Sequence, residues 1–320
     1  MELILISTIF FSSLIFCDAQ YFPDLQKALE GEQYDPDCVF NYTHVNSKSI
    51  KKFPKCDVVY GILVINNATD LTVDQLLAGF SLMKHLKGGV RIENTTFPNI
   101  SFFPITSEFV DFSVKTYGFF VRNNSELTNI GMLHKIWIYM NDNSESVFRV
   151  ENNPKLDAKF MCDFGYLYMY TEIVEIQNVW TTGIKLANFE NLHPDFCLTI
   201  EEMAFFLENE ITFLNLQAKI CADNRTKIND NSICNFESMG KLPENCNVMM
   251  GDLVVNPGDE AHFHKLESVR YVFGSIAVQN TSLENADMLS NIRYIVQLNE
   301  FDHPKKTNHS LPRQQCKLVP

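Results

Sequence analysis

The chain has 320 residues, 46% hydrophobic and 20% charged, which is the composition of an ordered globular protein and not of a disordered tail. Its 26 basic and 39 acidic residues give a formal net charge of −13. A surface this acidic repels polyphosphate and anionic lipid, so we expect neither non-specific nucleic-acid binding nor electrostatic docking on membranes.

The N-terminus predicts an exported protein. Residues 3–16 form an uncharged, mostly apolar run that is too short to span a bilayer, which takes roughly 20 residues. Small residues precede Gln20 at the positions that a signal peptidase reads, so we expect a signal peptide over residues 1–19. The Met-Glu start lacks the usual basic residue, and a buried N-terminal strand is the alternative. No later run is long enough for a membrane span, so we expect a secreted, extracellular product.

Sequons and cysteines agree with export. Asn-x-Ser/Thr occurs at eight positions, which predict N-glycosylation: Asn41, Asn67, Asn94, Asn99, Asn123, Asn224, Asn280 and Asn308. Loss of Cys17 with the signal leaves an even number of cysteines, which predicts disulfides: Cys38, Cys56, Cys162, Cys197, Cys221, Cys234, Cys246 and Cys316. No Cys-x-x-Cys pair occurs, which argues against a zinc ribbon and a thioredoxin-like site.

The chain contains an internal repeat. Residues 56–66 and 246–256 both read C-x4-G-x-L-V-[IV]-N. Farther along, 89–95 resembles 275–281, and each segment has Asn followed by Thr near its end. Two matches in the same order predict a duplicated module.

Short β-branched or aromatic runs that end in Asn recur within each module, and we expect each to be a strand. They are residues 61–67, 89–95, 118–124, 135–142, 146–153, 251–256, 274–281 and 293–299. Their regular spacing predicts the parallel coils of a solenoid, in which Asn suits the bend after each strand because it tolerates left-handed dihedral angles. The alternative is an antiparallel sandwich, which we consider weaker because tight hairpin signals are missing.

Capping boxes predict two helices, one beginning after Thr72 and the other after Thr199. Apolar residues follow each box at helical spacing: Leu76, Leu77, Phe80 and Met83 in the first, and Ile200, Met203, Ala204 and Leu207 in the second. We expect each helix to cover an open end of a coil. Residues 222–233 are polar and predict a linker, and residues 302–315 are similarly polar and irregular.

The sequence offers little that resembles catalysis. His262 and His264 would lie on one side of an extended segment and could begin a metal site beside Asp259 and Glu260, but an exposed polar loop is the simpler interpretation. Hydrolase and phosphate-binding motifs are missing. Glu201 and Glu202 suit the first turn of a helix better than an acid/base pair. We therefore expect no enzyme, no metal and no cofactor.

Three pairs of adjacent phenylalanines are better explained by the coil interior than by a binding surface. They are Phe102-Phe103, Phe119-Phe120 and Phe205-Phe206.

The combined pattern resembles the receptor L domain, which occurs in pairs in the extracellular parts of insulin and EGF receptors. The resemblance rests on the opening cysteines, Gly61 with its strand, the segment 88–95, the Asn153-Pro-Lys-Leu turn, and the cap from His193-Pro-Asp-Phe-Cys197 to Cys221. The second module would begin with Cys234 and Cys246 and continue through Gly251 and Gly274. Nematode secreted proteins with two such domains are the most similar. Unlike the receptors, this chain has no cysteine-rich module between the two halves, no membrane span and no kinase.

The resemblance implies an α/β fold of two short right-handed β-helices, similar to leucine-rich-repeat solenoids, with capping helices. The modules would cover residues 38–221 and 234–316, the second being the shorter. It also implies the disulfides Cys38–Cys56, Cys197–Cys221 and Cys234–Cys246. Cys162 and Cys316 then remain, and only elimination would pair them.

The resemblance implies a secreted, non-catalytic glycoprotein that binds an extracellular peptide or protein, with insulin-like and EGF-like ligands as candidates. Such a protein would act as a decoy, carrier or co-receptor. The alternative is a structural or adhesive glycoprotein that self-associates. A hydrolase would need a polar cleft with perturbed carboxylates, and the sequence identifies none. The ligand, its binding residues and the oligomeric state are not specified by the sequence.

Overall fold

The structure is a computed structural model that describes residues 25–26, 29–30, 33–104, 110–115, 117–140, 147–157, 168–171, 173–176, 179–182, 185–221, 227–228, 231–281 and 285–296. The chain divides into two compact units. Unit 1 contains the chain up to Phe196 together with Glu208–Gln217, and unit 2 contains Cys197–Leu207 and the chain from Ala218. The predicted signal peptide, Cys162, Cys316, Asn224, Asn308 and residues 302–315 lie outside the described residues.

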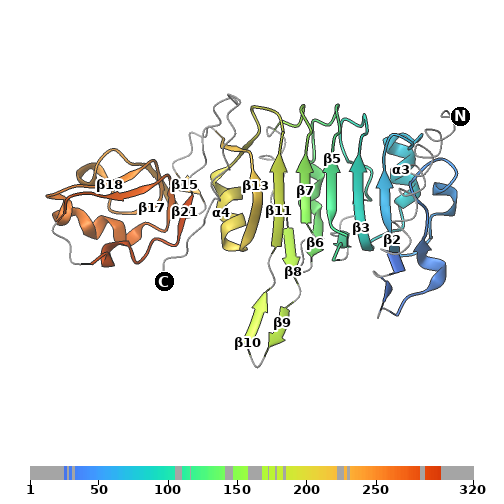
Figure 1. Cartoon of the computed structure of the whole chain (residues 1–320), viewed down its shortest axis with the longest axis horizontal. Coiled ribbons are helices and arrows are strands. Elements are labelled where there is room, and N and C mark those ends of the chain that lie inside the picture. The colour runs from blue at the N-terminus through green and yellow to red at the C-terminus, as the bar shows by residue number, and fades with distance from the viewer. Residues whose placement is uncertain are drawn as a thin grey trace, which may run out of the picture. The chain divides into compact units, whose positions relative to one another are not determined.

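Unit 1 is built on one large sheet whose strands all pair in parallel (Figure 1). Its strands are β1 (Val39–Phe40), β2 (Val58–Ile65), β3 (His85–Glu93), β4 (Val110–Ser113), β5 (Phe119–Arg122), β6 (Ile136–Met140), β7 (Val147–Glu151), β8 (Tyr168–Thr171), β11 (Lys185–Glu190) and β13 (Ile211–Leu216). A separate antiparallel hairpin consists of β9 (Ile173–Ile176) and β10 (Val179–Thr182). Parallel pairing favours the predicted solenoid over the antiparallel sandwich, and the handedness of the coil stays a prediction.

The sheet divides into two wings at β3. Residues 85–87 of β3 pair with β4, and residues 90–93 pair with β5. The first wing continues from β4 through β6 to β8, and the second from β5 through β7 and β11 to β13. Each turn of the coil therefore contributes one strand to each wing, as a solenoid requires.

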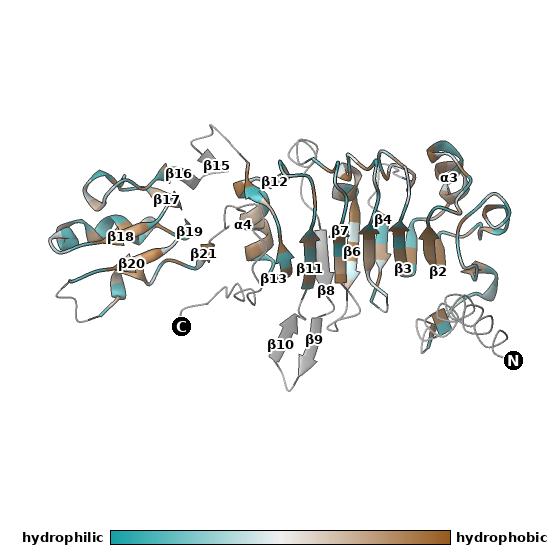
Figure 2. Cartoon of the chain, turned by 45° about the horizontal axis from the view of Figure 1, so that its top comes forward, coloured by the Kyte–Doolittle hydropathy of each residue, from teal (hydrophilic) through white to brown (hydrophobic). Residues whose placement is uncertain are grey.

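Phenylalanine rings fill the interior of unit 1. A chain of ring contacts runs from Phe80 to Phe103, Phe112, Phe119, Phe148 and Phe189, with centroids 4.9–6.2 Å apart. These six rings are at most 1% exposed. Strand β2 is almost entirely buried, and Figure 2 shows it mainly in the apolar colour. The prediction that Phe102, Phe103 and Phe119 fill the coil is confirmed, whereas buried Phe120 lies on the outward side of the second wing.

Glycine marks the corner where β3 passes from one wing to the other. Gly88 pairs with Gly61 of β2 and has a φ of +145°. A Cβ on Gly88 would lie 2.2 Å from the carbonyl oxygen of Gly61, and one on Gly61 would lie 2.7 Å from the carbonyl oxygen of Phe40. Any side chain at these corners would force neighbouring coils apart.

Asparagine forms the corner at the end of the second wing. Asn94, Asn123, Asn152 and Asn191 follow β3, β5, β7 and β11, and their φ angles are +51° to +57°. This confirms the predicted left-handed bends after residues 89–95, 118–124 and 146–153, whereas Asn66 and Asn256, at the ends of two other predicted strands, do not have positive φ angles. The backbone N–H of Asn94 donates to the carbonyl of Arg122, and that of Asn123 donates to Glu151, so each bend is bonded to the next coil.

The residues after these bends form a buried ladder. Asn124 Oδ1 accepts from the backbone N–H (3.0 Å) and the hydroxyl (2.8 Å) of Thr95. Asn153 Oδ1 accepts from the Asn124 backbone N–H and side-chain amide at 3.0 and 3.1 Å. The two amides also donate to the carbonyls of Ile92 and Val121. Because both asparagines are 0% exposed, water cannot replace these bonds.

Unit 2 repeats this design on a smaller scale. Its strands are β12 (Cys197–Leu198), β14 (Lys219–Ile220), β15 (Lys227–Ile228), β16 (Asn231–Asn235), β17 (Cys246–Met250), β18 (Leu253–Val255), β19 (Tyr271–Phe273), β20 (Ile276–Val278) and β21 (Tyr294–Val296). Strands β16, β17, β19 and β21 pair in parallel, as do β18 and β20. Strands β15 and β16 pair in antiparallel within the segment predicted as a linker. The predicted module boundaries stay predictions.

The glycine corner also recurs in unit 2. Gly251 has a φ of +101°, and a Cβ on Gly274 would lie 2.3 Å from the Gly251 carbonyl oxygen. This is the contact that Gly88 makes with Gly61 in unit 1. The sequence matches therefore align residues that occupy equivalent corners.

Two α-helices form where capping boxes predict them. Helix α3 (Val73–Phe80) has the complete box between Thr72 and Gln75. Leu76, Phe80 and Met83 are buried, but Leu77, predicted on the same face, is 37% exposed. Helix α4 is Ile200–Glu208. That these helices cover coil ends stays a prediction.

Short 3₁₀ helices make up the remaining regular structure: η1 (Pro36–Cys38), η2 (Ile50–Lys52), η3 (Gly131–Lys135), η5 (Met239–Lys241), η6 (Asp259–Ser268) and η7 (Asp287–Leu289).

The cap of α4 contains a buried carboxyl group. Glu202 Oε2 accepts from the Thr199 backbone N–H (2.8 Å) and hydroxyl (3.1 Å), and the Glu202 N–H donates to the Thr199 hydroxyl. Glu202 is 5% exposed. Burial raises the pKa of its carboxyl above the ordinary 4.5, although the bonds from Thr199 oppose the shift.

Replacement of Asn124 by Ala should destabilise the fold. The change leaves the Thr95 donors and the Ile92 carbonyl buried without their partner, so we expect the free energy of unfolding to fall by about 3 kcal/mol. Chemical denaturation of protein made without glycosylation measures it. Asn123→Gly, which keeps the left-handed bend and removes an exposed amide, is the control and should change little. Equal stabilities for the two variants would contradict a role for the ladder.

Gly274→Ala should destabilise unit 2 by about 2–4 kcal/mol, because its Cβ would overlap the Gly251 carbonyl. Gly240→Ala is the matched control in the same unit, since its Cβ would come no closer than 3.5 Å to His262. Thermal and denaturant unfolding of both variants checks this. A Gly274→Ala protein as stable as the control would show that the corner can relax.

Glu202→Gln should remove a pH dependence of stability. Because the folded-state pKa is raised, the folded chain holds more protons than the unfolded chain at pH values between 4.5 and the raised pKa. The free energy of unfolding of the wild type therefore falls as pH rises through this window, by at most about 1.4 kcal/mol per pH unit. The stability gained by Glu202→Gln should grow from pH 4 to 7. Exposed Glu260→Gln is the control, and a pH-independent difference for Glu202→Gln would refute the assignment.

Candidate ligand-binding face

The outward side of the first wing carries two rows of side chains set by the parallel register. One row contains Val58, His85, Asp111 and Trp137, and the other contains Tyr60, Lys87, Ser113 and Tyr139. The intervening row, Val59, Leu86, Phe112 and Ile138, is 0% exposed and points inward. Strand β8 pairs in register with β6, with residue 168 opposite Trp137 and residue 170 opposite Tyr139. We call Tyr60, His85, Lys87, Asp111, Trp137 and Tyr139 the aromatic face.

One end of the aromatic face is a cluster of tyrosines and a lysine. The rings of Tyr34 and Tyr60 lie 5.7 Å apart, and the Lys87 ammonium lies 5.6 Å from the centre of the Tyr60 ring. Tyr34 is 40% exposed, whereas Tyr60 is covered and its hydroxyl donates to the carbonyl of Gln33 at 3.5 Å. This end therefore presents an accessible ring beside a fixed positive charge.

The middle of the face holds an imidazole and a carboxylate. His85 Nδ1 and Asp111 Oδ2 are 3.2 Å apart, and their side chains are 44% and 31% exposed. Burial, and then the charge of Asp111, raises the pKa of Tyr139 above its usual range. The Tyr139 hydroxyl is protonated at neutral pH, as it would be without this shift.

Such a face is suited to protein recognition. Tyrosine and tryptophan supply large, stiff contact areas with a polar tip, and they are enriched among the residues that dominate protein interfaces. The face adds a cation, an anion and a hydroxyl donor that can fix the register of a partner.

Part of the outward side of the second wing is instead occupied by its own ion pairs. Arg122 binds Glu93 through Nε (3.0 Å) and Nη2 (2.5 Å), and Arg149 binds Glu151 at 2.9 Å. Asn188 donates to Glu151 at 2.5 Å. These residues already pair with one another across the four strands β3, β5, β7 and β11, so we interpret them as a structural network.

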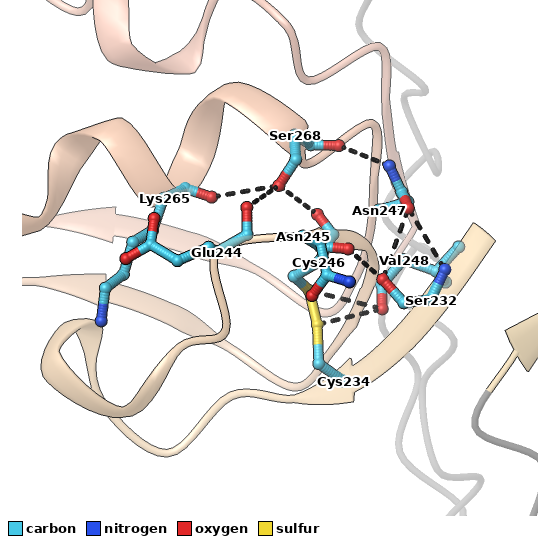
Figure 3. Close-up of a disulfide and its surroundings, with 9 residues drawn as sticks. All are labelled: Ser232, Cys234, Glu244, Asn245, Cys246, Asn247, Val248, Lys265 and Ser268. Carbon is cyan, nitrogen blue, oxygen red and sulfur yellow. Dashed lines mark hydrogen bonds between the residues drawn. A yellow bond between two sulfur atoms is a disulfide. The ribbon is translucent and has the colours of Figure 1, made fainter.

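Six predicted disulfide residues are paired in the structure as Cys38–Cys56, Cys197–Cys221 and Cys234–Cys246, the pairs that the family resemblance implies. Figure 3 shows Cys234–Cys246 beside Ser268, whose hydroxyl donates to the carbonyls of Cys246 (2.9 Å) and Glu244 (3.0 Å). This disulfide therefore joins β16 to β17 where hydrogen bonds also hold the chain to the end of η6.

Six predicted glycosylation sites lie among the described residues. Asn99 is half-buried, and five are exposed: Asn41, Asn67, Asn94, Asn123 and Asn280. Asn94 and Asn280 share the left-handed bend that their matching sequences imply, with φ angles of +57° and +50°. None of the six described sequons lies within a strand of the first wing.

The His-x-His segment does not form the extended strand that a metal site there would need. His262 and His264 lie in the 3₁₀ helix η6, which also replaces the predicted loop. His264 Nε2 lies 3.2 Å from Glu244 Oε1. Among the described residues, no three His, Cys, Asp or Glu side chains form a group that could hold a metal ion.

The aromatic face was not predicted from the sequence, because β4 and β8 were not among the predicted strands. The alternation of Trp137 and Tyr139 with buried Ile136 and Ile138 was the available signal. The cross-strand neighbours of these rings come from three other coils, and only the register brings them together.

Comparison with known proteins supports the duplicated plan. The family model of the receptor L domain matches residues 55–168 and 245–308, which together make up more than half of the chain. No curated protein matches the chain. No helix within the described ranges is both long and apolar enough to cross a membrane. The two matched segments each contain a glycine corner, and the chain belongs to the receptor L domain family.

Proposed function

We propose that this protein is an extracellular binding protein that recognises a peptide or protein ligand through the aromatic face. Receptor L domains are ligand-binding domains, and the chain carries two matches to the family. The observation that carries the proposal is the set of aromatic and charged side chains held outward on rigid parallel strands.

Secretion and glycosylation belong to the same proposal. Disulfides are stable in oxidising compartments, and the structure holds three of them. The exposed sequons lie at bends and loops, where an attached glycan would meet solvent. Because none of the six described sequons lies on a strand of the first wing, glycans at these positions would leave the aromatic face accessible.

A role as decoy, carrier or co-receptor follows if the secreted chain captures a ligand without signalling itself. Insulin-like and EGF-like peptides are the first ligands to test. A non-catalytic role agrees with the composition of the aromatic face, where aromatic contact area and a few charged side chains would supply the binding energy.

The test is a binding screen with the secreted chain immobilised and a panel of insulin-like and EGF-like peptides in solution. At least one peptide should bind saturably, and Tyr139→Ala should raise its dissociation constant about 10–100-fold, as expected for a central aromatic contact. Lys87→Glu should also weaken binding. Leu82→Ala, which changes an exposed side chain beyond the end of α3, should not.

Two outcomes would contradict the proposal. One is a panel in which nothing binds, while light scattering shows concentration-dependent oligomers, which favours a self-associating structural glycoprotein. The other is binding that neither substitution on the aromatic face affects, although both variants unfold at the wild-type temperature. The ligand would then bind elsewhere on the chain.

A further inference from the structure

A second surface, on the outward side of the second wing, is apolar and already covered. It consists of Ile62 and Val64 of β2, Tyr117, and Phe120 of β5, which form one cluster and are 2–9% exposed. Ile62 and Val64 alternate along β2 with the fully buried Leu63 and Ile65 of the interior, so they point outward. We call these four residues the docking patch.

Gly89 shapes the docking patch. A Cβ on Gly89 would lie 2.6 Å from the Cβ of Tyr117, so only glycine allows Tyr117 to lie directly over β3. Tyr117 and Phe120 are 6.1 Å apart between ring centres. The patch is thus a continuous aromatic and aliphatic surface across three strands.

Two leucines from the N-terminal segment cover this patch. Leu25 belongs to the cluster and is 6% exposed, and Leu29 packs against it. Residues 25, 26 and 29 are helical, and the i, i+4 spacing places both leucines on one helix face. Gln26 and Glu30 are exposed. The described residues therefore place two leucines against the sheet and two polar side chains in solvent, which is the pattern of an amphipathic helix.

Arginines surround the patch. The guanidinium carbons of Arg122, Arg91 and Arg149 lie 4.9, 5.2 and 5.9 Å from the centre of the Phe120 ring. The segment that covers the patch is acidic, with Asp24, Glu30 and Glu32 against a single Lys27 between residues 24 and 32. Arg122 and Arg149 are also paired with Glu93 and Glu151, so these guanidinium groups border the patch without giving its edge a net positive charge.

A helix this short is marginal in water without tertiary contacts, because nucleation is costly. The segment also precedes the first disulfide at Cys38, so no crosslink between described cysteines holds it in place. Its folding therefore depends on the two leucines, and an uncovered patch would expose apolar rings to solvent.

We propose that the docking patch is a helix-binding surface, occupied in cis by the chain's own segment around Leu25 and Leu29. It takes an amphipathic helix with two leucines at i, i+4, bound in the helix-in-groove manner. The segment is displaceable, so a helix of the same chemistry in trans competes with it. This surface is distinct from the aromatic face of the first wing.

The test uses a fluorescent synthetic peptide of residues 20–33 as the probe and the full chain as the receptor. The double variant Leu25→Asp and Leu29→Asp should release the segment from the docking patch. The labelled peptide should then bind this variant saturably and at least tenfold more tightly than it binds the wild type. Gln26→Asp, which changes an exposed position, should behave as the wild type does. Adding Phe120→Asp should abolish binding, and a peptide with the same two Asp substitutions should not bind.

Equal affinity of the peptide for wild type and double variant, with near-ultraviolet circular dichroism unchanged, would overturn the proposal. If the double variant fails to fold, hydrogen exchange of the wild-type chain tests whether the segment around Leu25 and Leu29 leaves the docking patch. Backbone amides around Leu25 and Leu29 should exchange at least 100-fold faster than those in the centre of β3. Exchange as slow as that of β3 would show that the segment is a permanent part of the core.

Discussion

The close stacking of backbone at the glycine corners constrains both units. Parallel strands in adjacent coils are about 4.8 Å apart, and a corner that bends the chain inside this spacing leaves no room for a Cβ. Gly88 on Gly61 and Gly274 on Gly251 satisfy this limit in the same way, with the missing side chain facing a carbonyl oxygen. When the glycine corners of neighbouring coils are aligned, the strands before and after each corner are also aligned with their neighbours in both wings.

Different chemistry holds the interior together once the corners are set. The phenylalanine rings of unit 1 supply apolar area, whereas Asn124 and Asn153 bond the bends of neighbouring coils. The rings tolerate small shifts because their contacts are non-directional, but the amides fix the coils relative to one another through oriented hydrogen bonds. The aromatic face depends on this precision, since its rows exist only if four strands keep their register.

Local patterns predicted local features of this fold well. Asn at a strand end predicted the left-handed bends, and the boxes at Thr72 and Thr199 predicted α3 and α4, because each depends on residues within a few positions. The three disulfides match pairs that came from family resemblance, not from spacing.

Features that depend on distant residues were not predictable in the same way. Leu77 is exposed although its spacing suits a buried face, Phe120 points outward under Leu25, and His262 lies in a 3₁₀ helix. Each of these outcomes is decided by what the neighbouring coil or the N-terminal segment presents. The aromatic face belongs to the same class, since its members come from separate coils.

The hairpin β9–β10 shows how the coil accommodates added sequence. It lies between β8 and β11, yet β8 still pairs with β6 and β11 still pairs with β7. An insertion in the connection between the two wings thus leaves the stacking of the coils unchanged. The strands pair with their neighbours across the sheet, and this pairing does not depend on the length of the connection. The same connection is a natural place to graft a foreign loop or an affinity tag, and a route by which related chains could acquire new recognition elements without redesigning their core.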